Sequence, residues 1–174
     1  MTKEQLPEKQ HDAKELSQLI TLMMKLPEEQ GGNLKKAIRL AKQLASIEPT
    51  EGHRRLAELY LLSKKWKKLE IEESIVCELS GYENNDVQHF IKALTEQEKY
   101  TEAAEIIEKA LKNRPTPFFL FLATKISVKY SVNAAFGLQC AYNFMRNYPD
   151  HSLFSDVEQH GKQIAKKMHQ RWLP

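Results

Sequence analysis

Residues 64–68 read KKWKK and combine positive charge with an aromatic ring in the way that nucleic-acid-binding sites do. Ammonium groups such as those of Lys64 and Lys68 neutralise phosphates, and the indole of Trp66 could stack on a base. Three glutamates follow at positions 70, 72 and 73 and dilute the positive field. A contact with nucleic acid is therefore one hypothesis. A solvated corner between two helices is the interpretation that we favour.

The sequence carries no pattern typical of a catalytic or metal-binding site. It contains no G-x-S-x-G, no glycine-rich phosphate loop and no H-E-x-x-H. Cys77 and Cys140 form no C-x-x-C pair, and we expect both to be small core residues of separate helices. The histidines are dispersed along the chain, at His11, His53, His89, His151, His160 and His169. We therefore expect no enzymatic activity, no metal and no cofactor.

Length and charge fit a single helical domain. The chain has 174 residues, which is long enough for a sizeable core, and only 6 of them are glycine. Its 26 basic and 23 acidic residues leave a net charge of +3, which gives no strong global field for nucleic acid. The N-terminal segment is polar, and no apolar run approaches the roughly 20 residues that span a bilayer. These features predict a cytoplasmic protein.

Residues 84–115 contain two helical patterns joined by a very short turn. In the first pattern, apolar residues recur at the i, i+3, i+4, i+7 spacing of one helix face, at Val87, Phe90, Ile91 and Leu94. The second pattern has the same spacing, at Tyr100, Ala103, Ala104, Ile107, Ala110 and Leu111. The short connection predicts an antiparallel pair of helices, and Pro115 ends the second helix because it lacks an N–H.

The landmarks of this hairpin recur at a fixed interval along the chain. Trp66, Tyr100 and Ala134 each open a second helix. The three units end at Gly81, Pro115 and Pro149. A hairpin cannot bury its apolar face alone, so it needs copies of itself on either side. Helix–turn–helix units that recur about every 34 residues therefore predict a stacked array of hairpins.

The unit at 84–115 resembles the tetratricopeptide repeat family. The second-helix pattern of that family is matched by Tyr100, Ala103, Ile107, Ala110 and Pro115. The resemblance implies an all-α fold, a right-handed α-α superhelix of about three to four helical hairpins with a C-terminal capping helix. It also implies that Trp66 and Tyr100 are buried between the helices of their own repeats.

The repeat register divides the chain into a tail and one domain. Residues 1–10 are expected to form a flexible tail, and residues 11–174 a single repeat-like domain. Residues 11–49 are expected to form a divergent N-terminal hairpin, with an unrelated hairpin packed on the array as an equal alternative. The repeats follow at 50–81, 84–115 and 116–149. Residues 151–173 predict an amphipathic helix that caps the array, in preference to a basic helix lying on a membrane surface.

In the tetratricopeptide family, the concave groove is lined by first-helix positions that face away from the second helix. The register of the hairpin carries these positions over to Arg54, Glu58, Leu61, Gln88, Lys92, Thr95, Phe119, Leu122, Ile126 and Lys129. Only Arg54 and Lys92 suit the clamping of a carboxylate. Phe119, Leu122 and Ile126 form an apolar strip, which is typical of an interaction site.

The sequence leaves open what covers this strip. A partner helix, a second copy of the chain or one of the chain's own terminal helices could lie on it. In the remaining alternative, Phe119 belongs to the core of the last repeat and the strip is not a binding surface.

The resemblance implies a non-enzymatic protein–protein interaction module, an adaptor or chaperone-like scaffold that binds a peptide or helix in the groove. The expected partner is another protein, with a homodimer as a further possibility and with neither nucleic acid nor membrane expected. The alternative function is nucleic-acid or membrane-surface binding through the turn from Lys64 to Lys68 and the basic C-terminal helix. A salt titration separates the two functions, because phosphate binding weakens steeply with salt.

Overall fold

Nine helices follow one another in the computed structural model, which describes residues 12–26 and 33–173. In chain order they are α1 (Ala13–Lys25), α2 (Leu34–Ile47), α3 (Pro49–Leu62), α4 (Trp66–Ser80), α5 (Asn84–Thr95), α6 (Tyr100–Asn113), α7 (Pro117–Tyr130), α8 (Ala134–Asn147) and α9 (Phe154–Lys167). The expected tail at 1–10 lies outside the described residues. Within the described residues all regular structure is helical, as the sequence predicted.

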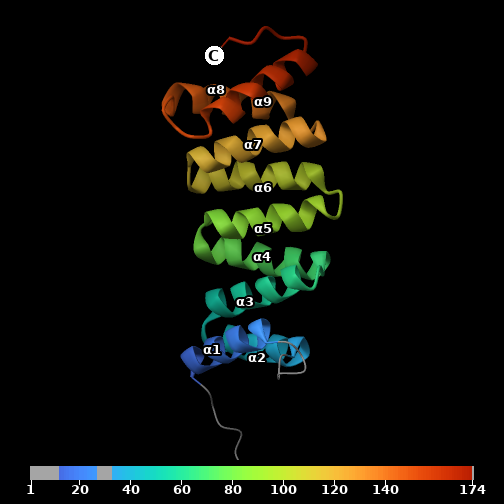
Figure 1. Cartoon of the computed structure of the whole chain (residues 1–174), viewed down its shortest axis with the longest axis vertical. Coiled ribbons are helices and arrows are strands. Elements are labelled where there is room, and N and C mark those ends of the chain that lie inside the picture. The colour runs from blue at the N-terminus through green and yellow to red at the C-terminus, as the bar shows by residue number, and fades with distance from the viewer. Residues whose placement is uncertain (1–11, 27–32, 174) are drawn as a thin grey trace, which may run out of the picture.

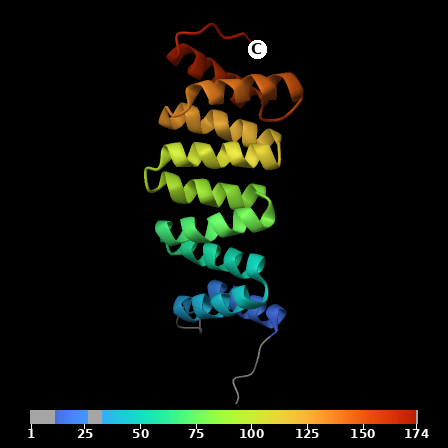
Figure 2. The same ribbon diagram turned by 180° about the vertical axis from the view of Figure 1, so that it is seen from behind.

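The helices form one elongated stack in chain order, with α1 and α9 at opposite ends (Figures 1 and 2). Each helix packs against the next one along the chain. First helices of neighbouring hairpins touch as well, α1 with α3, α3 with α5 and α7 with α9. This nearest-neighbour packing is what a helical repeat array requires, because each hairpin buries its apolar face only against adjacent hairpins.

Short polar side chains and prolines fix where several helices begin. Asp12, Asn33 and Thr116 each accept a hydrogen bond from the backbone N–H three residues later. Pro49 and Pro117 occupy the first positions of α3 and α7. Proline has no N–H, and a backbone N–H at this position would have no partner within the helix, so no hydrogen bond is lost. These residues mark the starts of α1, α2, α3 and α7, whereas α4, α5, α6, α8 and α9 begin without a side-chain cap.

The turns between paired helices repeat at the predicted period. Lys64 and Glu98 hold equivalent positions in successive hairpins, and both have left-handed backbone, with φ of 52° and 60°. The N–H of the next residue donates to the carbonyl of Tyr60 in the first turn, at 2.9 Å, and to that of Leu94 in the second, at 3.0 Å. The same geometry ends both first helices.

The second helices keep the repeat period in their packing. α4, α6 and α8 bury matching positions at Leu69, Ala103 and Gly137, and again at Val76, Ala110 and Phe144. At Gly137, α8 lies so close to α7 that a Cβ would clash with the side chain of Ser127. This close approach explains a glycine in mid-helix, where it costs about 1 kcal/mol of helix propensity.

The first helix of the last repeat departs from this period by a single position. The step from Asn84, which begins α5, to Pro117, which begins α7, is one position shorter than the repeat period. Ala123 and Thr124 take the buried places that Phe90 and Ile91 have in α5. An alignment at the full period assigns those places to Thr124 and Lys125, and Lys125 is in fact exposed. The register expected from the repeat period was therefore wrong for α7, although it holds for α8.

The buried side chains gather in two large clusters that meet at α4 and α5. One cluster joins α1 to α4 and contains Leu44 and Leu59. The other joins α5 to α9 and contains Ile107 and Phe144. Both α4 and α5 contribute buried residues to each cluster. The junction of these two helices therefore connects the halves of the array.

The last helix packs on α7 and α8 and ends earlier than the sequence suggested. The sequence predicted a helix over residues 151–173, whereas α9 runs from Phe154 to Lys167. The chain then turns through a left-handed residue, His169, with φ of 53°. Trp172 folds back to stack on Tyr142 of α8, with 4.9 Å between ring centroids. The tryptophan is thus part of the end of the stack without being part of the helix.

Trp66 and Tyr100 are only half-buried, which corrects the expectation that each is enclosed within its own repeat. Tyr100 stacks on Tyr130 of α7, with 4.2 Å between ring centroids and 13° between the ring planes. The ammonium of Lys92, on α5, lies 5.8 Å from the centre of the Trp66 ring. Both rings therefore contact the first helix of the following repeat.

Candidate partner-binding groove

A pocket of about 230 Å³ lies between α5 and α7. The described residues that line it all belong to these two helices, Gln88, Ile91, Lys92 and Thr95 of α5 and Phe118, Phe121, Leu122, Lys125, Ile126, Lys129 and Tyr130 of α7. We call it the α5–α7 groove. Neither α1 nor α9 contributes to its lining, so neither terminal helix, as far as the structure describes them, fills it.

The α5–α7 groove combines apolar walls with basic side chains. Phe121 and Leu122 are partly exposed in it, and Lys92, Lys125 and Lys129 line it as well. The ammonium of Lys125 lies 5.7 Å from the centre of the Phe121 ring, so its charge sits directly beside the apolar wall. A partner segment in this groove would meet apolar contacts and positive charge together.

Two of the three lysines form no ion pair among the described residues. Lys92 pairs with Glu96 at 2.8 Å, and this contact lowers the pKa of the Glu96 carboxyl. Within residues 12–26 and 33–173, Lys125 and Lys129 form no ion pair with a carboxylate. Tyr130, whose ring centre lies 4.9 Å from the ammonium of Lys129, raises the pKa of Lys129. The groove thus keeps a net positive charge.

The structure brings together six of the ten groove residues expected from the sequence. These are Gln88, Lys92, Thr95, Leu122, Ile126 and Lys129. Phe119 is fully buried, as the alternative interpretation of that residue had it, and Ile126 is only 4% exposed. Partner binding by the six residues stays a prediction. Phe119 is no longer included in it, because its side chain is buried.

The other three expected residues lie on α3 and take part in contacts within the chain. Arg54 donates to both carboxylate oxygens of Asp86, at 3.1 Å and 2.9 Å. Glu58 pairs with Arg55 at 2.9 Å, and Leu61 is half-buried. Since Arg54 already holds a carboxylate of this chain, clamping of a partner's carboxylate by Arg54 and Lys92 has no support.

Sequence reasoning missed several residues of the groove because of the register shift in α7. One full repeat after Gln88 and Lys92 the pattern points to Leu122 and Ile126, whereas a step shorter by one position gives Phe121 and Lys125. The number of residues from the start of α7 to the start of α8 is larger by one than the number from the start of α5 to the start of α6. This restores the repeat period in the second helices. The one-residue shift in α7 therefore cannot be seen in the sequence pattern, because only the second helices carry clear landmarks and these keep the repeat period. A count from the proline that begins α7 would have found it.

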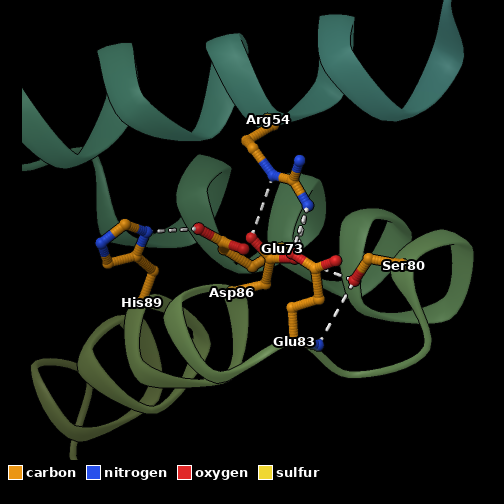
Figure 3. Close-up of polar contacts among 6 residues, drawn as sticks. All are labelled: Arg54, Glu73, Ser80, Glu83, Asp86 and His89. Atoms are coloured by element: carbon orange, nitrogen blue, oxygen red, sulfur yellow. Dashed lines mark hydrogen bonds and ion pairs between the residues drawn. The ribbon is translucent and has the colours of Figure 1, made fainter.

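A buried polar cluster joins α3, α4 and α5 where the two apolar clusters meet (Figure 3). Its centre is Asp86, which is 3% exposed and accepts hydrogen bonds from Arg54 and from Ser80 at 2.8 Å. Arg54 also reaches Glu83 at 3.3 Å. The Asp86 hydrogen bonds raise the pKa of Arg54 further above its ordinary value. A buried carboxylate with this many partners fixes how neighbouring helices dock.

The second part of the cluster is Glu73, which occupies a core position. Its equivalents in α6 and α8 are Ile107 and Ala141, both fully buried. Glu73 is 1% exposed, and His89 lies 3.1 Å from one of its oxygens. Its other oxygen has no hydrogen-bond partner among the described residues. Burial raises the pKa of Glu73, while the hydrogen bond with Glu73 raises the pKa of His89.

These two shifts predict that the protein loses stability as the pH rises. A group whose pKa is raised by folding stabilises the native state while it is protonated. That contribution fades above the ordinary values of 4.5 for Glu73 and 6.5 for His89. The free energy of unfolding, measured in urea, is therefore expected to fall between about pH 5 and about pH 8.

Glu73→Gln is the control for this pH dependence. Glutamine keeps the size of the side chain and can still hydrogen-bond His89, but it does not titrate. The variant is expected to show a flatter profile than the wild type. Burial lowers the pKa of His160, which acts in the opposite direction, so the difference between the two proteins is the quantity to compare. Identical slopes would contradict the assignment to Glu73.

The basic segments that suggested nucleic-acid or membrane-surface binding make contacts within the chain. The lysine-rich segment 64–68 covers the end of the turn from α3 to α4 and the first residues of α4, and Lys92 lies over the ring of Trp66. In α9, Lys162 pairs with Glu158 at 2.8 Å. In the described part of the chain, no helix is long and apolar enough to cross a membrane.

The cysteines are poor candidates for chemistry. Burial raises the pKa of Cys140 to about 12 and that of Cys77 well above its ordinary value, so both thiols are protonated at neutral pH. Across residues 12–26 and 33–173, no group of three or more His, Cys, Asp or Glu side chains could hold a metal ion.

Comparison with known proteins supports the repeat fold. No protein-family model matches the sequence, and no curated protein matches it. Among solved structures, the chain is similar to the crystal structure of YrrB, described as a TPR protein with an unusual peptide-binding site. The similarity covers 92% of this chain and 79% of that chain, with a TM-score of 0.63 and 13% sequence identity. The protein is therefore a tetratricopeptide-like helical repeat protein in its fold.

Proposed function

We propose that the protein is a non-enzymatic interaction module that binds a segment of a partner protein in the α5–α7 groove. The observation that carries this proposal is a pocket with apolar walls that is bordered by three lysines, two of which form no ion pair among the described residues. A repeat scaffold suits the role, since stacked hairpins present a long surface to one partner. An adaptor or a chaperone-like role in the cytoplasm is the biological form that we propose.

The chemistry of the groove defines the partner segment. Phe121 and Leu122 offer apolar contact, so the segment needs an apolar stripe of its own. Lys125 and Lys129 favour acidic residues beside that stripe, because opposite charges across an interface steer association and reject the wrong partner. The peptide-binding site named for YrrB lends support by analogy of fold alone.

Three labelled peptides of about 20 residues, or about five helical turns, test the proposal by fluorescence anisotropy. The first has a leucine stripe flanked by glutamates, the second has the same stripe flanked by lysines, and the third has glutamates with the stripe changed to serine. The first peptide is expected to bind most tightly, the second weakly and the third not at all. Equal binding of all three, or of none, would count against the groove.

Salt dependence separates this function from phosphate binding. A partner held by apolar walls and two or three charges loses affinity modestly as salt increases, whereas binding that depends on many phosphate contacts falls by about 10³-fold or more between 50 and 200 mM salt. The groove is the better candidate, since the ring of Trp66, which would have to stack on a base, is half-buried and already has the ammonium of Lys92 5.8 Å from its centre.

A further inference from the structure

The outer side of α4 carries an apolar stripe that nothing in the described chain covers. Ile71 and Leu79 are 55% and 50% exposed, and Ile75 between them is half-buried. The three residues are spaced four apart, so they lie along one side of the helix. They form what we call the α4 stripe.

The repeat fold does not require apolar residues at these positions. In α6, one repeat later, the equivalent side chains are Glu105, Lys109 and Asn113. In α8 they are Gln139, Asn143 and Asn147. All six are polar and exposed, as expected for a solvated face. The apolar stripe is therefore a particular property of α4, and exposed apolar side chains in a line are typical of an interaction site.

The charges of α4 are arranged against its own dipole. Lys67 and Lys68 lie in the first turn, which holds no acidic residue, and the last turn holds no basic residue. Glu78 is exposed near the C-terminal end, where it accepts a hydrogen bond from the Tyr82 hydroxyl at 2.6 Å. Helices are normally stabilised by the reverse arrangement, because the N-terminus is the positive end of the dipole. Within residues 12–26 and 33–173, neither Lys67 nor Glu78 forms an ion pair.

We propose that a second copy of this chain covers the α4 stripe, with the two α4 helices antiparallel across a two-fold axis. In that arrangement Ile71 of one copy lies beside Ile75 of the other. Lys67 and Lys68 then lie beside Glu78 of the second copy, twice by symmetry. The same surface is used on both copies, as in most homodimers. Each basic end meets the acidic end and the negative dipole terminus of the other helix, so the unfavourable charge arrangement of a single α4 is relieved.

This dimer does not depend on the α5–α7 groove and leaves it open. Among the described residues the groove is lined by α5 and α7, and the stripe lies on α4. Each dimer would therefore present two grooves, and a partner with two binding segments would gain affinity through the higher effective concentration of the second site. A single pair of helices buries less area than a standard interface, so we expect a dimer that dissociates on dilution.

Sedimentation velocity of the full chain, from about 1 μM to about 1 mM, tests the proposal. The wild type is expected to shift from monomer to dimer across this range. Ile71→Glu combined with Leu79→Asn, which copies the residues of α6 at exposed positions, is expected to stay monomeric throughout. The matched control, Glu105→Ala on α6, is expected to associate as the wild type does.

A charge exchange checks the orientation of the two helices. Lys67→Glu is expected to weaken the dimer, because it places two glutamates beside each other at each end. Lys67→Glu combined with Glu78→Lys restores opposite charges and is expected to restore the dimer.

Two results would overturn the proposal. One is a wild type that remains monomeric at all concentrations, whether or not it binds vesicles of anionic lipid. The other is a dimer that persists unchanged in the variant with Ile71→Glu and Leu79→Asn.

Discussion

Phe119→Ala is expected to lower the free energy of unfolding by about 3–5 kcal/mol, the usual cost of deleting a buried phenylalanine side chain. Phe119 is fully buried and belongs to the cluster that joins α5 to α9. Its removal leaves a cavity in the half of the array that also supports the α5–α7 groove. Urea denaturation followed by circular dichroism measures the change.

Phe121→Ala is the matched control for this experiment. Phe121 lies two residues further along α7 and is only partly buried, with one side in the α5–α7 groove. Its truncation is expected to cost clearly less stability than that of Phe119. Equal losses at the two positions would mean that the register of α7 has been assigned incorrectly.

Phe121→Asp combined with Leu122→Asp is expected to weaken binding of the acidic, leucine-striped peptide by about 30-fold or more. Both side chains line the α5–α7 groove, and carboxylates there would be desolvated by the bound stripe. They would also repel its glutamates. Anisotropy titration gives the affinity.

Gln139→Asp combined with Asn143→Asp controls for added charge. These two residues are exposed on α8 and do not line the groove. The variant is expected to bind as the wild type does. If the α8 variant and the groove variant lose the same affinity, net charge rather than the groove controls binding.

The second helices of the array could be predicted from the sequence with little error. Trp66, Tyr100 and Ala134 were expected to open them, and they are the first residues of α4, α6 and α8. These helices carry landmarks at matching positions, such as Leu69, Ala103 and Gly137, so a step of one repeat identifies equivalent positions. Gly81, Pro115 and Pro149 then mark where these helices end.

The first helix of the last repeat could not be placed as accurately. α7 is apolar around most of its circumference, from Phe118 and Phe119 to Ile126, so periodicity does not distinguish its buried side from its groove side. A shift of one residue rotates a helix by about 100°. That rotation places Phe118 rather than Phe119 in the groove and adds Phe121 beside Leu122.

The buried polar cluster was not predictable from the sequence either. Glu73 occupies the position that Ile107 and Ala141 have in the later repeats. In the sequence it is simply one of several glutamates that follow the lysine-rich segment 64–68. Its partner His89 comes from the next repeat. Such pairs depend on tertiary packing between hairpins, which a pattern within one helix does not contain.

Site-specific photo-crosslinking of the bound peptide tests the proposed groove most directly. A photoreactive residue replaces Thr95, which is partly exposed in the α5–α7 groove, and in a second protein it replaces Asn143, which is exposed on α8. The acidic, leucine-striped peptide is expected to crosslink at position 95 and not at position 143. Crosslinking at position 143 with equal yield, or no crosslinking at position 95 under saturating peptide, would contradict the groove as the binding site.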